Sequence, residues 1–219
     1  SHYIETAVLK SSGIVNTTTI HNAFDPSWNQ ESEVLPKGLT GKKYILSYGR
    51  IVDSIKDFSF LIRSFEASGL WKEDIQLVIM GDGPDKSTLQ QLAAVSQAGD
   101  KIVFLHFRSS PFSVIRKAQF VTLTSKFEGF PMVLVESLSL GTPVVSLDII
   151  SGPNEIIQSV FNGLLIEERS IPLFAKAMER MVTDSRLYST CKDNASSSVN
   201  EFSMQEISKK WKQLLSNEA

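Results

Sequence analysis

The sequence from residue 128 to residue 136 reads Glu128-Gly129-Phe130-Pro131-Met132-Val133-Leu134-Val135-Glu136. Proline is favoured at the first position of a helix and glycine just after the last, so Pro131 and Gly141 predict a helix over residues 131–140. Glu128 then lies in the loop before this helix, whereas Glu136 lies inside it. Because the residues around Glu136 are apolar, its carboxylate is expected to be buried and to need a partner.

A ligand with hydroxyl groups would satisfy the Glu136 carboxylate through hydrogen bonds. The backbone N–H groups of residues 129–133 face outward at the start of the helix, where an anion binds favourably. Together these features predict a polyhydroxylated and phosphorylated ligand, such as a sugar nucleotide. The alternative is that a buried arginine neutralises Glu136.

From residue 44 onward, short apolar runs alternate with helical patterns, which indicates βαβ units and a parallel sheet. The expected strands are residues 44–48, 76–80, 102–105, 120–123 and 144–147. A capping box at residues 54–57 predicts the start of a helix that ends at Gly69 and buries Phe58, Leu61, Ile62 and Phe65. Three more helices are expected over residues 171–182, 186–195 and 204–215. Residues 1–40 show little periodicity beyond a short strand at 17–20 and a turn at 22–26.

Polar side chains follow the expected ends of the strands. They are Arg50, Asp82, His106, Arg108, Glu128 and Asp148. Open parallel sheets bind ligands at the edge formed by the carboxyl ends of their strands. These residues are therefore expected to gather along one crevice, although loops are polar in general.

Arg50 and Lys56 flank the turn after the first expected strand, so both can reach one point beyond the sheet edge. A guanidinium and an ammonium suit a diphosphate and would stabilise the negative charge that develops on it as it departs. The alternative is that both are solvated surface cations. The sequence has no Asp-x-Asp, and its three histidines and single cysteine lack metal-ligand spacing, so neither a metal nor a cofactor is expected.

The spacing of Glu128 and Glu136, with Gly-Phe-Pro between them, resembles the E-x7-E signature of retaining glycosyltransferases of family 4. Further segments resemble the nucleotide-binding domain of that family in the same order: residues 47–50 with Lys56, then 78–84, 103–105, 141–145, 152–155 and 162–165. The resemblance covers most of the chain. It implies an α/β fold, with a Rossmann-like parallel sheet flanked by helices, that forms the C-terminal half of a GT-B enzyme.

The resemblance also implies roles for individual residues. Arg50, Lys56 and Glu128 would be catalytic, with Glu128 positioning the sugar rather than acting as a nucleophile, and Glu136 would bind the ribose. His106, Phe107 and Arg108 stand where the family meets the base, His106 at a position where many relatives have glycine. The full set implied to bind the donor is Gly49, Arg50, Lys56, Gly81, His106, Phe107, Arg108, Glu128, Gly129, Phe130, Pro131, Met132, Val133 and Glu136.

Composition sets the domain organisation. The 219 residues are 42% hydrophobic and 21% charged, with a net charge of -2, which describes an ordinary globular domain with no bias toward nucleic acid or anionic membranes. This length suits one Rossmann domain, not two. We expect residues 1–40 to be a crossover from a missing N-terminal domain, residues 41–200 to be the donor-binding domain, and residues 201–219 to be a helix that returns toward the missing domain.

The implied function is transfer of a glycosyl group from a UDP- or GDP-linked sugar to an acceptor hydroxyl. The resemblance implies a retaining, metal-independent hexosyltransferase. It would act in the synthesis of bacterial surface polysaccharide or of a lipid-linked glycan. This fragment alone is expected to be inactive, and the acceptor glycan or lipid-linked saccharide to bind the missing domain. Without a spanning segment or signal peptide, the expected location is the cytoplasm, at most peripheral to the inner face of the membrane. A nucleotide-sugar epimerase of the same fold and a non-catalytic nucleotide-binding module are the alternatives.

Overall fold

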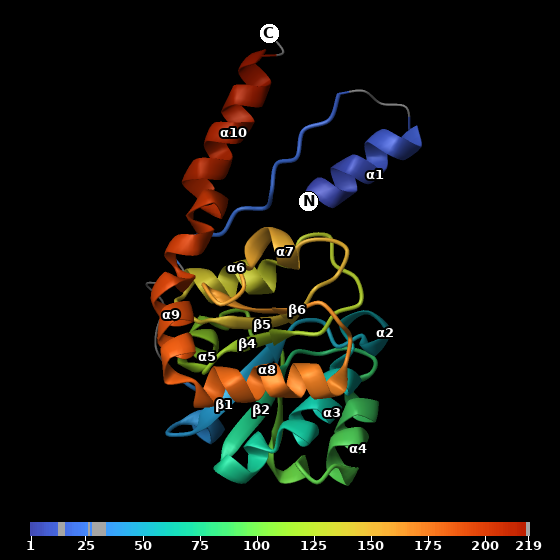
Figure 1. The fold of residues 1–219 in the computed structure, drawn as a ribbon, viewed down its shortest axis with the longest axis vertical. Coiled ribbons are helices and arrows are strands. Elements are labelled where there is room, and N and C mark those ends of the chain that lie inside the picture. Colours follow the sequence, from blue (N-terminus) through green and yellow to red (C-terminus); the bar gives the residue numbers. More distant parts are fainter. Residues whose placement is uncertain (13–15, 26, 28–33, 218–219) are drawn as a thin grey trace.

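The computed structural model describes residues 1–12, 16–25, 27 and 34–217. Its centre is a six-stranded sheet of order β3-β2-β1-β4-β5-β6, in which every neighbouring pair is parallel (Figure 1). The strands are β1 (Lys43–Tyr48), β2 (Ile75–Met80), β3 (Ile102–Leu105), β4 (Val121–Leu123), β5 (Val144–Leu147) and β6 (Gly163–Ile166). This is the doubly wound Rossmann order, and the order of the strands reverses between β1 and β4.

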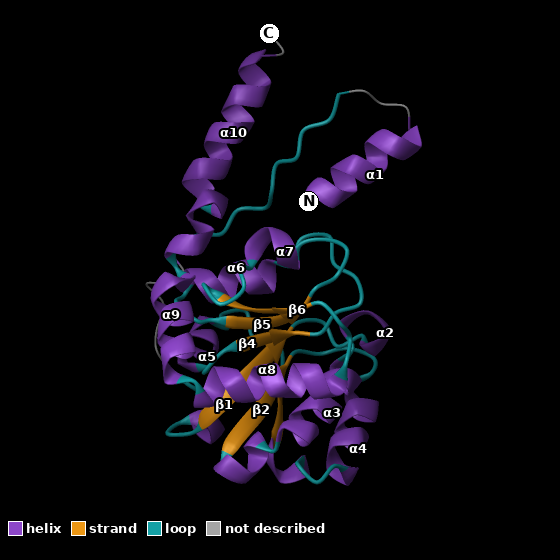
Figure 2. Cartoon of the chain, viewed as in Figure 1, coloured by secondary structure: helices purple, strands orange, loops and turns teal. Residues whose placement is uncertain are grey.

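Helices cover both faces of the sheet because alternate strand residues point to opposite sides. In β1, Ile45 belongs to one apolar cluster, whereas Tyr44 and Leu46 belong to the other. The first face is covered by α3 (Phe58–Ser68), α4 (Lys86–Val95) and α8 (Ile171–Thr183), and the second by α5 (Phe112–Lys117), α6 (Met132–Ser139) and α7 (Pro153–Ile156). The three layers can be followed in Figure 2.

The remaining helices lie at the chain ends or next to the helices that cover the sheet. They are α1 (His2–Ser12), α2 (Asp53–Lys56), α9 (Ser185–Ala195) and α10 (Met204–Asn217), with 3₁₀ turns at Lys37–Leu39, Leu70–Glu73, Gly99–Lys101 and Ser197–Phe202. The helix α9 passes from one face to the other, since Leu187 and Cys191 belong to the first cluster and Ala195 to the second.

The predicted parallel sheet flanked by helices is confirmed, and the five expected strands agree with β1 to β5 within one residue. The helices expected at residues 131–140, 171–182, 186–195 and 204–215 correspond to α6, α8, α9 and α10. The sixth strand, β6, is not among the expected strands, because four residues give too little periodicity to predict one. The helix α1 was also not predicted.

The predicted capping box at residues 54–57 is wrong. Ser54 lies inside the single turn of α2, and Asp57 adopts a left-handed conformation (φ 53°) that separates α2 from α3. The predicted stripe of α3 is nevertheless correct, because Phe58, Leu61, Ile62 and Phe65 are all buried. The left-handed turn lets the chain change direction between Lys56 and the helix that packs on the sheet.

Near the N-terminus, the strand predicted at residues 17–20 is absent from the structure, which gives these residues no strand pairing. Of the turn predicted at residues 22–26, Pro26 lies outside the described residues, while Phe24 pairs with Ser203 just before α10. This segment, α1 and α10 all stand beyond the same end of the sheet domain (Figure 1).

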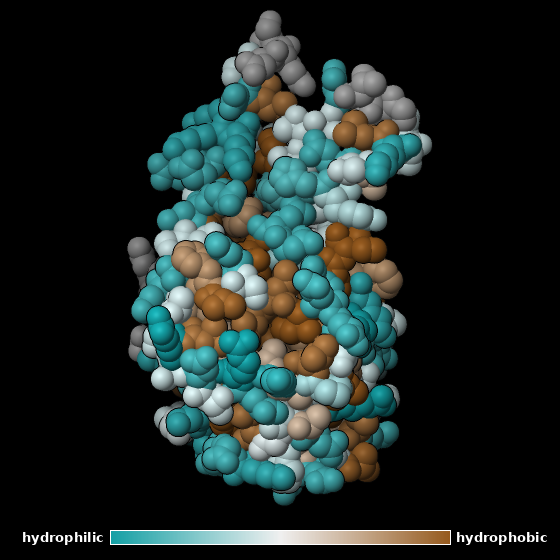
Figure 3. Space-filling model, viewed as in Figure 1, coloured by the Kyte–Doolittle hydropathy of each residue, from teal (hydrophilic) through white to brown (hydrophobic). Residues whose placement is uncertain are grey.

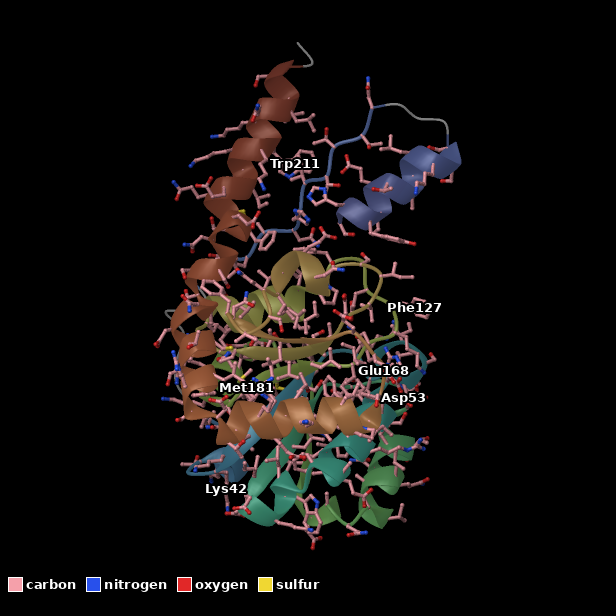
Figure 4. All side chains as sticks on the ribbon, in the orientation of Figure 1. Lys42, Asp53, Phe127, Glu168, Met181 and Trp211 are labelled. Atoms are coloured by element: carbon pink, nitrogen blue, oxygen red, sulfur yellow. The ribbon has the colours of Figure 1, made fainter. Side chains whose placement is uncertain are left out.

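The apolar face of α10 is buried only at its start. Ile207 is 4% exposed, whereas Trp211 and Leu215 are 49% and 64% exposed. Trp211 lies well away from the sheet (Figure 4). In the space-filling view, hydrophilic atoms dominate the outer side of this upper region, with apolar atoms between α10 and α1 (Figure 3). None of the described helices is long and apolar enough to span a membrane.

Candidate functional site

The carboxyl ends of the strands form one edge of the domain. Asp53 follows β1, Phe127 follows β4 and Glu168 follows β6, and the three lie on the same side of the molecule, opposite Lys42, which precedes β1 (Figure 4). The loops after β1 and β4 leave the sheet in opposite directions because the strand order reverses there. Such a point opens a crevice in which ligands bind.

A cavity of about 300 Å³ opens at this edge, between the ends of β1 and β2 and the starts of α5 and α6. It is lined by Tyr48, Gly49, Met80, Gly81, Phe107, Arg108, Ser109, Pro111, Phe112, Val133 and Glu136. The walls are mostly apolar, with a carboxylate, a phenol, a guanidinium and a serine hydroxyl as polar side-chain groups. This composition is typical of a small-molecule site.

Glu136 lies in the wall of this cavity, one turn into α6. Its Oε2 atom is 2.8 Å from the Tyr48 hydroxyl, and no guanidinium pairs with it in the described part of the chain. The structure therefore contradicts the alternative in which a buried arginine neutralises it. Burial raises the pKa of the Glu136 carboxyl, an effect that the hydrogen bond from Tyr48 partly offsets.

Lys56 and Glu128 form an ion pair beside the cavity, with 2.6 Å between Nζ and Oε1. The Ser125 hydroxyl donates to the same carboxylate oxygen at 2.6 Å. The Lys56 side chain passes over Gly49, since a Cβ atom built on Gly49 would lie 3.8 Å from the lysine Cε. The pair thus borders the part of the cavity that Gly49 lines.

The loop that carries Glu128 is fastened to the end of α2, which carries Lys56. The Thr124 hydroxyl donates to the backbone carbonyls of Lys56 and Asp57, at 3.0 and 3.1 Å. Arg169, which follows β6, donates to the carbonyls of Thr124 and Ser125 and to the carboxylate of Asp57. One guanidinium from a distant part of the sequence therefore holds both segments together.

The opposite wall of the cavity is held by Asp82. Its carboxylate accepts hydrogen bonds from Lys86 Nζ, from the Phe107 backbone N–H and from His106 Nδ1, at 2.8, 2.8 and 2.9 Å. The hydrogen bond from Lys86, followed by that from Phe107, holds the pKa of Asp82 well below its usual range. These contacts fix the loop whose residues Phe107 and Arg108 line the cavity.

Glycine is required where the loops after β1 and β2 touch. Gly81 has φ 152°, and a Cβ atom there would lie 1.9 Å from the Gly49 carbonyl oxygen. The two loops can therefore approach one another and form the cavity floor only without a side chain at position 81.

A second cluster lies outside the cavity. The side chains of His2, His21 and Glu155 place atoms that could bind a metal within 4.8 Å of one another. Two of the three histidines, which are far apart in the sequence, therefore lie close together in the fold. His21 is buried, with its Nε2 atom 2.9 Å from Glu155 Oε2, and its ring packs against Phe130 and Phe202. The His21–Glu155 contact fastens the N-terminal segment to α7.

With this geometry established, comparison with known proteins identifies the family. Residues 30–198 match the family described as Glycosyl transferases group 1.

The chain belongs to this family.

Among curated proteins, this group 1 glycosyltransferase chain is 32% identical over 167 residues to the N-acetylgalactosamine-N,N'-diacetylbacillosaminyl-diphospho-undecaprenol 4-alpha-N-acetylgalactosaminyltransferase of Campylobacter jejuni. The match covers 76% of this chain and 45% of that protein. It is 33% identical over 175 residues to the lipopolysaccharide 1,6-galactosyltransferase of Escherichia coli, covering 77% of this chain and 47% of that protein. The chain thus spans about half the length of these relatives.

Among solved structures, Anabaena HepE in complex with UDP has a TM-score of 0.86 at 21% identity, over 99% of this chain and 62% of that chain. A mutant of S. aureus TarM in complex with UDP and other ligands has a TM-score of 0.80 at 23% identity, over 98% of this chain and 42% of that chain. These likenesses confirm that the fold is shared with one half of GT-B glycosyltransferases.

The residues predicted to bind the donor divide into three groups. Gly49, Gly81, Phe107, Arg108, Val133 and Glu136 line the cavity. Lys56 and Glu128 lie beside it, and Arg50 is exposed in the loop after β1, with no ion pair to its side chain among the described residues.

The third group lies outside the cavity lining. Gly129, Phe130, Pro131 and Met132 lead into α6, and the side chain of Phe130 packs against His21 and Phe202. His106 has an 87% exposed side chain that pairs with Asp82. His106 is thus not among the residues that line the cavity, and its predicted part in donor binding stays a prediction.

Sequence reasoning missed Tyr48, Ser125, Arg169 and four lining residues, Met80, Ser109, Pro111 and Phe112. Tyr48 could have been noticed as a phenol at the end of an otherwise apolar strand. Arg169 gave no local signal, because its partners lie 44 to 112 residues away in the sequence.

Proposed function

We propose that this domain binds the nucleoside diphosphate sugar of a retaining glycosyltransferase. The observation that carries the proposal is Glu136, a largely buried carboxylate that faces a cavity at the strand-order reversal with no cation paired to it among the described residues. A ribose offers two neighbouring hydroxyls that would satisfy this carboxylate. The cavity beyond it has room for a base.

The diphosphate would lie toward Lys56, Arg50 and the N-terminus of α6. Lys56 is held in place by Glu128, and Arg50 is exposed with its fork of donors available. The positive end of the α6 dipole adds to this field. We expect these groups to stabilise the departing diphosphate without a metal ion.

Glu128 would accept hydrogen bonds from the transferred sugar. Its Oε1 atom already accepts hydrogen bonds from Lys56 and Ser125, which leaves Oε2 for a sugar hydroxyl. A group fixed in this way suits positioning rather than covalent catalysis. The acceptor would then attack from the face that the diphosphate leaves, with retention of configuration.

HepE is described in complex with UDP and with UDP-glucose, which favours a uridine nucleotide for this chain as well. The names of the relatives favour a lipid-linked saccharide or lipopolysaccharide acceptor. Because the chain spans about half of those proteins, we propose that the acceptor and any peripheral membrane contact belong to an N-terminal domain. Residues 1–40 and α10 would then connect to that domain.

The test is calorimetric binding of UDP, GDP, ADP and their glucose conjugates to this chain. We expect UDP-glucose to bind, Glu136→Ala to weaken both nucleotide and nucleotide sugar, and Glu128→Ala to weaken the sugar conjugate more than UDP. Glu73→Gln, at an exposed position on the Leu70–Glu73 turn, is the matched control. A nucleotide sensor would bind both ligands equally well after Glu128→Ala.

A full-length protein carrying this domain should transfer sugar to an acceptor, whereas this chain alone should not. Inversion of a donor sugar's stereochemistry without any acceptor would instead favour the epimerase. Absence of binding by every nucleotide tested would contradict the proposed function.

A further inference from the structure

Tyr48 lies between two hydrogen-bond acceptors at the end of β1. Its Oη atom is 2.8 Å from Glu136 Oε2 and 3.1 Å from the Val133 carbonyl oxygen. A phenol carries one proton, so it can donate fully to only one of them at a time. The position of that proton therefore depends on whether Glu136 is ionised.

Two arrangements fit these distances. If Glu136 is ionised, Tyr48 donates to the carboxylate and the Val133 carbonyl loses the phenol proton. If Glu136 is protonated, its own hydroxyl donates to Tyr48 Oη, and Tyr48 donates to Val133. Only the second arrangement uses both short contacts as hydrogen bonds.

The surroundings of Glu136 favour the neutral form. Among the residues that line the cavity with it, the titratable or charged ones are Tyr48, from β1, and Arg108, from the loop before α5. The lining residues from β2, α5 and the rest of α6 are uncharged. The nearby lysines are engaged elsewhere, because Lys56 pairs with Glu128 and Lys86 with Asp82. Burial raises the pKa of Glu136, an effect that the hydrogen bond from Tyr48 partly offsets, and burial also raises the pKa of Tyr48.

We propose that Tyr48 is a positioning residue whose hydroxyl donates to the Val133 carbonyl in the empty site and to the Glu136 carboxylate in the occupied one. Binding of a ligand's paired hydroxyls therefore releases a proton from Glu136. In the empty cavity Glu136 is a neutral acid. When the ligand binds, the Glu136 O–H bond breaks and the proton goes to solvent. The ligand hydroxyls and Tyr48 then donate to the carboxylate. The identity of the ligand rests on the proposed function, whereas the protonation of the empty site does not.

The first experiment needs no ligand. Infrared difference spectra of wild type minus Glu136→Gln are recorded at a pH where exposed glutamates are ionised. We expect the carbonyl band of a protonated carboxylic acid, absent from the difference between wild type and Glu73→Gln. Detection of only a carboxylate band for Glu136 would overturn the proposal.

The second experiment measures the affinity for UDP-glucose against pH. Wild-type affinity should fall by up to about tenfold for each pH unit below the pKa of Glu136 in the empty site, and level off above it. The contact with Tyr48 lowers the pKa of the Glu136 carboxyl, so in Tyr48→Phe the midpoint should move to higher pH and the loss of affinity should be greater in acid. If Tyr48 had a purely structural role, Tyr48→Phe would weaken binding by the same factor at every pH, and that result would contradict the proposal.

The two failures are distinguishable. If UDP-glucose fails to bind at any pH, the proposed donor is wrong, while the infrared experiment still decides whether Glu136 is protonated. If UDP-glucose binds with no pH dependence and Glu136 is ionised in the empty protein, the proposed function stands and the proton switch is rejected.

Discussion

The Nζ atom of Lys56 lies 2.6 Å from Oε1 of Glu128, and this pair joins the loop after β1 to the loop after β4. Both side chains are largely shielded from solvent, at 20% and 13% exposure. The contact crosses the point where the order of the strands reverses, so it connects the two halves of the sheet at the candidate site.

We predict that Lys56→Ala and Glu128→Gln each lower the turnover number of the full-length transferase by about 10²–10³-fold, as expected when a preorganised charge is lost. Because the two act as one unit, the double variant should be little worse than the poorer single variant. Steady-state kinetics measure this, with Lys176→Ala, at an exposed position on α8, as the control. If the double variant instead loses turnover by the product of the two single-variant factors, Lys56 and Glu128 act independently.

Arg169 should stabilise the site through its geometry as well as its charge. Arg169→Lys keeps a cation near Asp57 but cannot reproduce the fork that reaches the carbonyls of Thr124 and Ser125. We expect a loss of about 1–3 kcal/mol in the free energy of unfolding, from buried acceptors left unpaired. Urea titration checks this against Arg186→Lys, at an exposed position on α9, and equal effects would contradict it.

Asp82 predicts a pH dependence of stability. Its folded-state pKa is lowered, mainly by the hydrogen bond from Lys86 and next by that from the Phe107 N–H. The contribution of Asp82 to the free energy of unfolding is therefore fully present above the ordinary aspartate pKa of about 3.9, and it is lost as the pH falls through the folded-state pKa. Asp82→Asn should therefore be less stable than wild type at neutral pH, and the difference should shrink in acid. Urea unfolding across this range measures it, with exposed Asp100→Asn as the reference. A stability difference between wild type and Asp82→Asn that stays constant across the pH range would contradict this prediction.

Gly81→Ala should disrupt the cavity floor. The added methyl would lie 1.9 Å from the Gly49 carbonyl oxygen, and the backbone there is at φ 152°. We expect a loss of about 1–3 kcal/mol or more in unfolding free energy, together with weaker nucleotide binding. Gly38→Ala, where a Cβ meets nothing within 4 Å, is the control. Thermal unfolding of both variants is sufficient, and similar melting temperatures would refute the prediction.

The elements that the sequence predicts best are those with a local hydrophobic pattern. Runs such as Tyr44–Tyr48 and Val144–Leu147 are apolar because both faces of the sheet are covered, and such runs predict buried parallel strands directly. Prediction from the sequence was least successful at short elements, as at Gly163–Ile166, where a four-residue strand has too little periodicity, and at Asp57, whose left-handed turn overrides the capping pattern.

By itself the sequence determined that this chain forms a parallel sheet flanked by helices and that Glu136 lies in an apolar helix, because hydrophobic periodicity and Pro–Gly boundaries act over a few neighbouring residues. Only the tertiary structure decided what each charge meets. Tyr48 reaches Glu136 across 88 residues and Arg169 reaches Asp57 across 112, and such contacts depend on the strand order and on the directions of the loops. Local patterns carry no record of that order, so the partners of the site residues became visible only once the strands were assembled.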